Sequence, residues 1–392
     1  QFGWSQLQLH TPFFKLQPCV YLPYSYLIRR STIMETHRAA VLTSPQGSDG
    51  KPTFAVRDEP RPVPGPNEVL IRLSVTGLCG SDLGMAMGHF GPLDRKILGH
   101  EGVGRIAALG SNIAALDQSV QVGQRVGVAW TRDTCGNCEA CVDLVNEGET
   151  RCEKTLHSGR AYDGTFAQYT LAPLRYLARL PAQFDEVPDE EVAPILCAGV
   201  TAYKAIKNCH VTPGSWFAIS GAGGGVGALG VAYARAMGYR VIGVDAGPEK
   251  GEICKDQGAE VYIDVTEPGT LAEKVRKATG GYGAKAVVVA ATATAAYQDA
   301  FELLAPFGTL MCVGILPWEA KVNFNPIWLI GKGWKILSSS VGSRADILEA
   351  LEFVRRRVVV PNVHVGKIDD LEELVQTMHG GQLKGKWVLK LD

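Results

Sequence analysis

Three side chains of metal-binding type lie within the stretch from Gly77 to Glu101. Cys79 stands in a turn flanked by glycines, and the adjacent pair His100–Glu101 ends the stretch. A thiolate, an imidazole and a carboxylate suit a catalytic zinc ion, which takes three protein ligands and keeps a fourth position for water or substrate. A buried cysteine beside an ordinary His–Glu pair would explain the same residues. This stretch alone therefore leaves both interpretations open.

Four further cysteines crowd into one loop with the spacing C-x2-C-x2-C-x10-C. They are Cys135, Cys138, Cys141 and Cys152. Thiolates at these spacings can close a tetrahedral site around zinc, which stabilises a fold and has no open position for chemistry. A zinc ribbon for nucleic acid is the alternative, but the loop carries acids where phosphate contact needs Lys or Arg. These acids are Glu139, Asp143, Glu147 and Glu149. The spacing therefore predicts a structural zinc site.

A glycine-rich turn, Gly221-Ala-Gly-Gly-Gly-Val-Gly227, lies between a predicted strand and a predicted helix. Glycines let such a turn tighten and let backbone N–H groups approach a pyrophosphate at the helix N-terminus. Asp245 ends the next predicted strand, 18 residues beyond Gly227. A carboxylate at that distance accepts hydrogen bonds from the adenosine ribose and repels a 2′-phosphate, which favours NAD over NADP. A glycine-rich turn without a ligand is the alternative.

The elements that must position these residues fall into two groups. From Ala39 to about Val192 the chain shows short strands with Gly and Pro between them, which predicts a compact β-rich domain. From about Pro194 strands and helices alternate, and the strands are almost continuously apolar, which predicts a parallel sheet covered by helices. The fold class is therefore α/β. We expect a β-rich domain from 34–193 together with the tail 339–392, and a nucleotide-binding domain over 194–338.

Composition and charge narrow the class of protein further. The 392 residues are 46% hydrophobic and 20% charged, and the net charge of -1 gives no argument for binding nucleic acid or a membrane surface. No apolar run approaches the roughly 20 residues that span a bilayer. We expect a cytoplasmic protein. Residues 1–33 lack Asp and Glu; we expect an unstructured extension there, with a mitochondrial transit peptide (and a matrix location) as the alternative.

Together these motifs resemble the zinc-dependent medium-chain alcohol dehydrogenases, especially those of fungal, yeast type. The resemblance runs from about Met34 to the C-terminus. It rests on the four-cysteine loop and on the sequences Gly99-His-Glu-x2-Gly104-x5-Gly110-x2-Ile113, YDGTFAQY at 162–169, SGAGGGVG at 220–227, AMGYRVIGVD at 236–245 and VGSRADILEAL at 341–351. It implies a GroES-like catalytic domain, a Rossmann domain, two zinc ions per chain, NAD, and a homotetramer.

The resemblance also implies roles for individual residues near the first stretch. The catalytic zinc ligands would be Cys79, His100 and Cys197, and Glu101 would be able to coordinate the metal transiently. Asp82 would accept the N–H of His100 and fix its tautomer. Ser81 would take the place of the hydroxyl residue that bonds the alcohol.

Cofactor and substrate contacts are implied in the same way. The cofactor-binding residues would be Gly223, Gly224, Gly225, Val226, Gly227, Asp245, Lys250, Val313, Val341 and Lys386. Phe90 and Trp130 would line the substrate pocket, which favours small or flat alcohols. Ala86 falls where yeast-type enzymes usually carry a bulky aromatic residue, so we expect a pocket wider than ethanol requires.

Two positions depart from the family pattern. Gly80 stands where the family usually has His or Arg in contact with the cofactor phosphates, so a charge-assisted contact is missing. Gly84 stands where many members carry a histidine that relays a proton. We expect the proton to leave from Ser81 through the ribose hydroxyl to water, and less favourably through His89.

The expected activity is oxidation of a primary alcohol, with secondary or aromatic alcohols included, to an aldehyde or ketone, with reversible hydride transfer to NAD. A zinc-free medium-chain reductase of enones or quinones is the first alternative, but it has no use for Cys79, His100 and Cys197 together. A metal-binding structural or regulatory protein is the second, and it would not explain the glycine-rich β–α–β unit.

Overall fold

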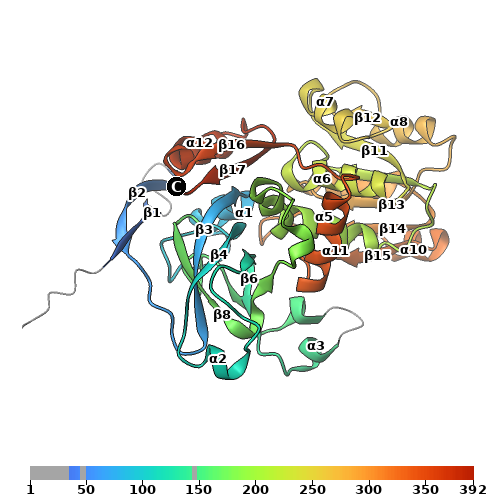
Figure 1. The fold of residues 1–392 in the computed structure, drawn as a ribbon. Helices are drawn as coiled ribbons and strands as arrows, with labels where there is room; N and C mark the ends of the chain where they lie inside the picture. Colours follow the sequence, from blue (N-terminus) through green and yellow to red (C-terminus); the bar gives the residue numbers. More distant parts are fainter. Residues whose placement is uncertain (1–34, 45–49, 144–147) are drawn as a thin grey trace, which may run out of the picture. The chain divides into compact units, whose positions relative to one another are not determined.

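The structure is a computed structural model that describes residues 35–44, 50–143 and 148–392. The extension predicted over residues 1–33, with its alternative as a transit peptide, lies outside the described residues. Residues 35–392 group into one compact unit. Two large sheets organise this unit (Figure 1).

The larger helical part is built on a six-stranded sheet in which every neighbouring pair is parallel. Its order is β12-β11-β10-β13-β14-β15. The strands are β10 (Trp216–Ser220), β11 (Arg240–Asp245), β12 (Val261–Asp264), β13 (Ala284–Val289), β14 (Leu304–Cys312) and β15 (Lys335–Ser338). The connecting helices are α6 (Gly225–Ala236), α7 (Pro248–Asp256), α8 (Leu271–Ala278), α9 (Thr294–Leu303) and α10 (Pro326–Lys332). This arrangement confirms the predicted doubly wound sheet.

The strand order reverses at β10, because the chain adds β11 and β12 on one side and β13 to β15 on the other. In open parallel sheets, ligands bind beyond the carboxyl ends of the strands at this switch point. The glycine-rich turn follows β10 directly, so the fold puts it at the position where a dinucleotide binds.

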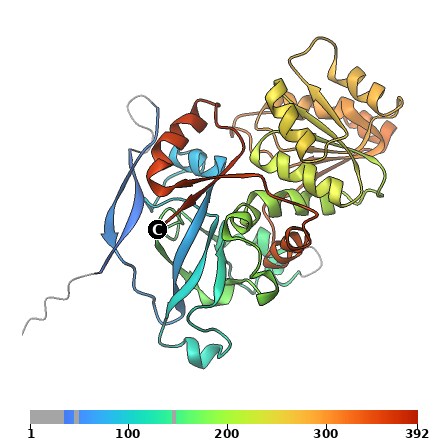
Figure 2. The same ribbon diagram turned by 45° about the horizontal axis from the view of Figure 1, so that its top comes forward.

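The second sheet is mostly antiparallel and has the order β16-β17-β3-β4-β5-β9, with β8 also paired to β3. Its strands are β3 (Glu68–Leu78), β4 (Gly102–Leu109), β5 (Arg125–Val128), β8 (Tyr169–Pro173), β9 (Ala178–Arg179), β16 (Val363–Lys367) and β17 (Lys386–Lys390). Two hairpin-like pairs accompany it: β1 (Thr36–Ser44) with β2 (Thr53–Pro60), and β6 (Thr131–Asp133) with β7 (Leu156–His157). The tail strand β17 lies beside β3, as Figure 2 shows. The C-terminal strand thus pairs with a strand of the β-rich part, and the assignment of 339–392 to that domain stays a prediction.

The remaining helices connect and cover these sheets. They are α1 (Gly80–Ala86), α2 (Ile113–Leu116), α3 (Glu139–Val142), α4 (Asp189–Val192), α5 (Ala198–Lys207), α11 (Arg344–Arg355) and α12 (Leu371–His379). Single 3-10 turns are η1 (Gly148–Arg151), η2 (Leu174–Tyr176), η3 (Ala182–Phe184), η4 (Ala193–Leu196) and η5 (Ile368–Asp370). The start of α11 is fixed by a capping box, because Ser343 and Asp346 satisfy each other's backbone N–H groups.

One buried cluster joins the two sheets. It combines Val75 of β3 and Val103 of β4 with Ile219 of β10, and α5, α6 and α11 pack into it. A separate cluster fills the far side of the parallel sheet around Ile242 and Val287. The predicted domain limits at 193/194 and 338/339 fall between the strands of the two sheets, and they stay a prediction. Among the described residues, none of the helices has the length and apolar character that crossing a bilayer requires.

Candidate active site

Four potential metal ligands meet where β3 ends, β4 begins and α5 starts. Cys79 caps α1 at the end of β3, His100 and Glu101 immediately precede β4, and Cys197 lies between η4 and α5. One ligand atom from each of these four residues lies within 4.8 Å of every other. The chain thus brings Cys197 next to two residues that are about a hundred positions away in sequence.

The donor geometry fits a zinc ion. The Cys79 and Cys197 sulfurs are 4.0 Å apart, and His100 Nε2 lies 3.2 Å from the Cys197 sulfur. Two thiolates at the usual zinc–sulfur distance of about 2.3 Å in a tetrahedron stand about 3.8 Å apart. Two sulfurs and one nitrogen form the donor set of a catalytic site with an open fourth position. These residues therefore fit the metal that the sequence predicts.

Asp82 positions this cluster from behind. Its Oδ1 accepts from His100 Nδ1 at 2.8 Å and from the Gly99 N–H at 3.1 Å, and its Oδ2 accepts from the Cys79 N–H at 3.0 Å. Asp82 and His100 are both fully buried. Burial alone would lower the pKa of His100, but the adjacent Asp82 carboxylate raises it well above its usual value. Nδ1 therefore carries the proton and Nε2 faces the two sulfurs.

Gly99 makes the turn that presents His100. Its φ is +95°, and a Cβ there would lie 2.6 Å from Thr165 Oγ1 and 2.9 Å from the Phe166 N–H nitrogen. Only glycine fits this left-handed, crowded position without strain. The glycine before the His–Glu pair is thus part of how the site is built.

The two thiols titrate differently because they interact with each other. A hydrogen bond from Cys197 lowers the pKa of Cys79 well below its usual value, with further help from His100. The same contact and burial raise the pKa of Cys197. One negative charge is therefore already favoured at the cluster, and a cation there would stabilise the second thiolate as well.

Glu101 forms a buried ion pair with Lys386 of β17. The lysine Nζ lies 2.7 Å from Oε1 and 2.6 Å from Oε2, and it also donates to the Leu78 carbonyl at 2.9 Å. Burial raises the pKa of Glu101 to about 7, against the opposing effect of Lys386. The sequence missed this pairing, since its partners are 285 positions apart. It holds the ammonium of Lys386, a predicted cofactor contact, close enough to Cys79 and Cys197 to interact with both electrostatically.

Two predicted pocket residues lie on one side of the cluster. The Trp130 ring stands edge-on to the His100 ring, with centroids 5.0 Å apart, and the Phe90 ring lies 5.8 Å from Trp130. The His157 ring also packs against the Trp130 ring, with their centroids 4.9 Å apart. Ser81, in the first turn of α1, is half-buried two residues after Cys79. The site therefore has an aromatic wall beside the metal ligands.

Gly84 leaves no room for a side chain. A Cβ there would lie 2.9 Å from the Phe90 ring, and His89 Nδ1 would be 3.7 Å away. The Phe90 ring and His89 therefore lie around Gly84, the position for which the family resemblance implies a relay histidine. Gly80, by contrast, has open space around it, with no heavy atom of the described residues within 4 Å of an added Cβ.

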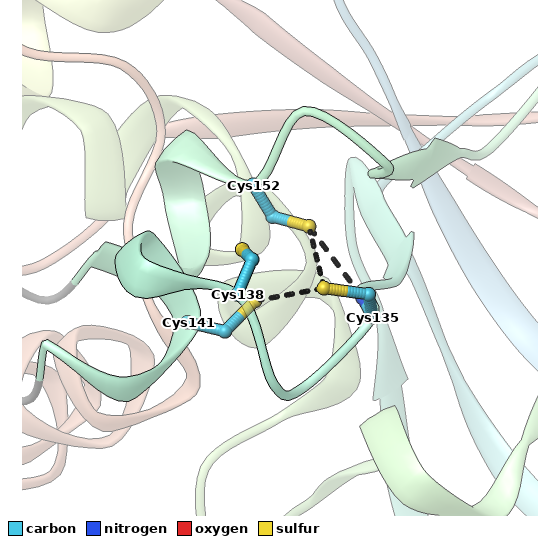
Figure 3. A group of neighbouring side chains, drawn as sticks. All are labelled: Cys135, Cys138, Cys141 and Cys152. Atoms are coloured by element: carbon cyan, nitrogen blue, oxygen red, sulfur yellow. Dashed lines mark hydrogen bonds between the residues drawn. The ribbon is translucent and has the colours of Figure 1, made fainter.

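The four-cysteine loop forms a second compact sulfur cluster (Figure 3). Its sulfurs all lie within 4.8 Å of one another, and the Cys135 sulfur is 3.9 Å from that of Cys141 and 3.6 Å from that of Cys152. These separations fit a tetrahedral all-sulfur zinc site. The Asn137 N–H lowers the pKa of Cys135 to about 6, while burial raises the pKa of Cys141 to about 11.

Glu149 ties this loop to the start of α11. Its Oε1 accepts from the Tyr176 hydroxyl at 3.0 Å and from the Arg344 N–H at 3.1 Å, and its Oε2 accepts from Arg344 Nη2 at 3.1 Å. Arg344 also lies over the Tyr176 ring. The loop therefore supports the turn that leads into α11.

The glycine-rich turn has the features of a dinucleotide cradle. Gly224 caps α6, and the Gly223 N–H donates to Asp245 Oδ2 at 2.8 Å. A Cβ on Gly223 would lie 2.5 Å from the Lys250 side chain, so the cradle needs a glycine there. Lys250 Nζ donates to Asp245 Oδ1 at 2.8 Å. Val226 and Gly227 follow in the first turn of α6. The predicted residues of this group are therefore together.

Two further predicted cofactor contacts lie at loop ends near the sheet. Val313 follows β14, and its N–H donates to the Val289 carbonyl at 3.2 Å. Val341 has φ +42°, a conformation that β-branched residues rarely adopt and that marks a strained position. It lines the same small cavity as Trp130 and Arg344. Val341 thus shares a cavity with Trp130 of the aromatic wall and with Arg344, the residue that Glu149 binds.

Comparisons with known proteins agree with this arrangement. Residues 65–182 match the family model "Alcohol dehydrogenase GroES-like domain", and residues 225–356 match "Zinc-binding dehydrogenase". An alcohol dehydrogenase of Schizosaccharomyces pombe is 39% identical over 365 residues, which cover 92% of this chain and 99% of that protein. Alcohol dehydrogenase 1 of Emericella nidulans is 37% identical over 336 residues, covering 85% and 93%.

A solved structure of similar fold is that of acetophenone reductase from Geotrichum candidum in complex with NAD. It aligns with a TM-score of 0.74 at 28% sequence identity, and the alignment covers 91% of this chain and 97% of that chain. The likeness therefore extends over both sheets described above.

Proposed function

Because the chain belongs to the zinc-dependent medium-chain alcohol dehydrogenase family, we propose that it oxidises primary alcohols, and secondary or aromatic ones, at a zinc ion held by Cys79, His100 and Cys197, with NAD as the hydride acceptor. The single observation that carries the proposal is the meeting of these three side chains, with Asp82 behind His100. The aromatic wall of Phe90 and Trp130 beside them supports a small, flat or aromatic substrate.

Zinc, when bound, would supply Lewis acidity that lowers the pKa of the alcohol hydroxyl, so that the hydroxyl loses its proton and the adjacent carbon can give hydride to NAD. The residues of this chain do the rest. Asp82 keeps the His100 proton on Nδ1, the aromatic wall excludes water, and Ser81 accepts the hydroxyl proton and passes it outward. Glu101, held by Lys386, is able to coordinate the metal transiently.

NAD would lie along the carboxyl edge of the parallel sheet. Its diphosphate would rest on the turn from Gly223 to Gly227, and its adenosine ribose would face Asp245 and Lys250. The carboxylate at Asp245 favours NAD over NADP. Val313 and Val341 would contact the nicotinamide side. The parallel sheet of β10 to β15 supports residues 194–338 as the NAD-binding domain, and the second sheet, which β16 and β17 join, supports 34–193 with 339–392 as the catalytic domain.

The proton's route out differs from the usual relay, since the Phe90 ring fills the space at Gly84. We propose that the proton passes from Ser81 to a ribose hydroxyl of NAD and from there to water. His89 is the alternative, and its Nδ1 is close to the Gly84 position. His89→Ala decides between them: an unchanged pH profile of kcat excludes the His89 route, and a shifted profile excludes the direct one.

A self-association surface is also part of the proposal. Strand β15 is the edge of the parallel sheet, and all four of its residues are exposed. The segment between β14 and β15 carries further exposed large apolar side chains, including Trp318 at 97% exposure and Ile327 and Ile330 of α10. An apolar edge strand of this kind is a site for pairing with a second copy, which supports the predicted homotetramer. Both cysteine clusters need reduced thiols, which supports the cytoplasm.

The test is a panel of alcohols with NAD and with NADP, before and after chelation of the metal. We expect NADH formation from primary alcohols, loss after chelation, recovery with added zinc, and much weaker use of NADP. Benzyl alcohol should be oxidised at a rate comparable to that of ethanol. Activity that survives complete removal of zinc would exclude the proposed site.

A further inference from the structure

A cavity lies at the N-terminus of α6, where a cofactor diphosphate would rest. Its lining includes Gly224 and Gly225 together with Lys384, Lys386 and His364. The two formal charges of this lining are lysines, and no Asp or Glu is among the described residues that line it. A helix N-terminus facing basic side chains favours an anion.

Three lysines near the glycine-rich turn are each paired with a carboxylate, but to very different degrees. Lys386 pairs with Glu101 at side-chain exposures of 8% and 0%, and Lys250 pairs with Asp245 at 46% and 10%. Lys384 pairs with Glu249 at 2.7 Å, with exposures of 66% and 68%. Exposed ion pairs contribute little and exchange partners easily. Of the three lysines, Lys384 therefore has the ammonium that can most easily leave its carboxylate partner and bind a ligand.

Lys386, a predicted cofactor contact, already holds its ammonium in a buried ion pair. Its ammonium donates to Glu101 and to the Leu78 carbonyl, and only its methylene groups approach Gly225, at 3.7 Å from a Cβ placed there. Moving that ammonium to another partner would leave the Glu101 carboxylate buried and unpaired. The free energy lost in this way is larger than the free energy gained from an exposed contact.

The backbone around Lys384 is fixed, so its side chain starts from a defined place. The Trp387 indole N–H donates to the Lys384 carbonyl at 3.2 Å, and Gly385 follows with φ +67°. Glu249 is in the first turn of α7, directly before Lys250. The Lys384–Glu249 pair thus links the loop before β17 to the first turn of α7, while Lys384 lines the cavity.

We propose that Lys384 binds the diphosphate of NAD, leaving Glu249 when the cofactor enters, and so replaces the contact that is missing at Gly80. This inference rests on the proposed use of NAD. Glu249 then acts as a competitor of the cofactor: it holds the ammonium while the cavity is free of anion. The two partners of one ion pair should therefore have opposite effects on binding.

The experiment compares ADP-ribose, which carries the diphosphate, with adenosine, which does not, by isothermal titration calorimetry on the zinc-loaded full chain. For Lys384→Gln we expect ADP-ribose affinity to fall about tenfold, since a hydrogen bond to a charged group is lost. For Glu249→Gln we expect it to rise about two- to fivefold, because an exposed ion pair no longer competes. The double variant should match Lys384→Gln, and adenosine binding should not change.

Lys390→Gln is the matched control, since Lys390 ends β17, the strand that follows Lys384, and is also exposed and paired with a carboxylate, that of Glu190. The ADP-ribose affinity of this variant should equal that of the wild type. Wild-type affinity in Lys384→Gln would overturn the inference while leaving the use of NAD intact. Weaker binding in Glu249→Gln would also overturn it, because the pair would then only shape the loop. Failure of the wild type to bind ADP-ribose or NAD would overturn both this inference and the proposed cofactor.

Discussion

Asp82 shows how one residue organises the site. Its two oxygens accept from the His100 ring and from the backbone N–H groups of Gly99 and Cys79. Two of these three donors belong to proposed metal ligands, and the third is the glycine that turns the chain toward His100. The carboxylate therefore fixes the position of both ligands before a metal binds, which reduces the reorganisation that metal binding requires.

We predict that Asp82→Asn weakens zinc binding about 10- to 100-fold, the usual effect of losing the partner of a metal-bound histidine. The amide keeps the shape but cannot hold the His100 proton on Nδ1 in the same way. Competition with a chromophoric chelator measures the affinity. Asp94→Asn, which changes an exposed acid in the loop between α1 and β4, is the control. Equal zinc affinity in Asp82→Asn and the control would show that Asp82 does not support the metal.

His157 provides a prediction about pH. Burial, with a smaller effect of Arg160, lowers the pKa of His157 to about 4. The unfolded chain binds a proton there near the usual value of about 6.5, so the folded state loses stability as pH falls from 6.5 to 4. His157→Phe keeps a ring against Trp130 but cannot titrate. Between pH 7 and pH 5, the free energy of unfolding should fall less in this variant than in the wild type. Equal losses would refute the assignment.

The contacts that could not be predicted from the sequence join residues that are far apart along the chain. The four cysteines of the loop lie within one short segment, so their spacing alone predicts a site. Cys197 has no such pattern, and only the resemblance to a family singled it out. The Glu101–Lys386 and Lys384–Glu249 pairs depend on how β17 packs against β3 and the glycine-rich turn, which no local pattern shows.

At the scale of elements, the four-cysteine loop supports α11. Glu149 joins η1 to Arg344, and Arg151 donates to the Ser338 carbonyl at 3.3 Å. These contacts flank Val341, whose left-handed backbone needs support from its surroundings. A loop with no open position for chemistry can thus influence the cofactor side of the site.

We predict that Glu149→Gln keeps its zinc but lowers stability by about 2 kcal/mol, because hydrogen bonds to a charged acceptor are weakened. Cys152→Ser should lose one zinc ion per chain and lower the thermal midpoint further, because the metal stabilises the folded loop. Metal analysis and thermal unfolding of both variants test this. A Glu149→Gln variant with the wild-type midpoint would show that the brace carries no stability.

The elements themselves were largely predictable. Strand, glycine-rich turn and helix follow each other from Trp216 to Ala236 because buried strands, turns and helices have different apolar periods. The return of the tail to the β-rich part was also predicted. The positive φ of Val341 was not, since a β-branched residue gives no local signal for that conformation.

At the scale of the whole molecule, strand β15 lies at an edge of the parallel sheet, and among the described residues of a single chain its outer side has no partner strand. Its Ile336 and Leu337 are exposed beside the apolar helix α10. Paired edges from two copies would continue the sheet and cover these side chains.

We predict that Leu337→Lys reduces the oligomer, because a buried unpaired charge at the pairing edge costs several kcal/mol. Light scattering coupled to size exclusion measures the particle mass. Val365→Lys is the matched control, since Val365 is also an exposed apolar residue on an edge strand, β16. An unchanged mass in Leu337→Lys would contradict the proposed interface.

We propose that alcohol oxidation takes place at a zinc ion held by Cys79, His100 and Cys197. This ion is separate from the zinc of the four-cysteine loop. The most direct measurement is zinc content together with NADH formation in the wild type and in Cys197→Ser. We predict two zinc ions per wild-type chain, and in Cys197→Ser a single remaining ion, no measurable turnover and unchanged ADP-ribose binding. A Cys197→Ser protein that keeps both zinc ions and oxidises alcohol at the wild-type rate would contradict it.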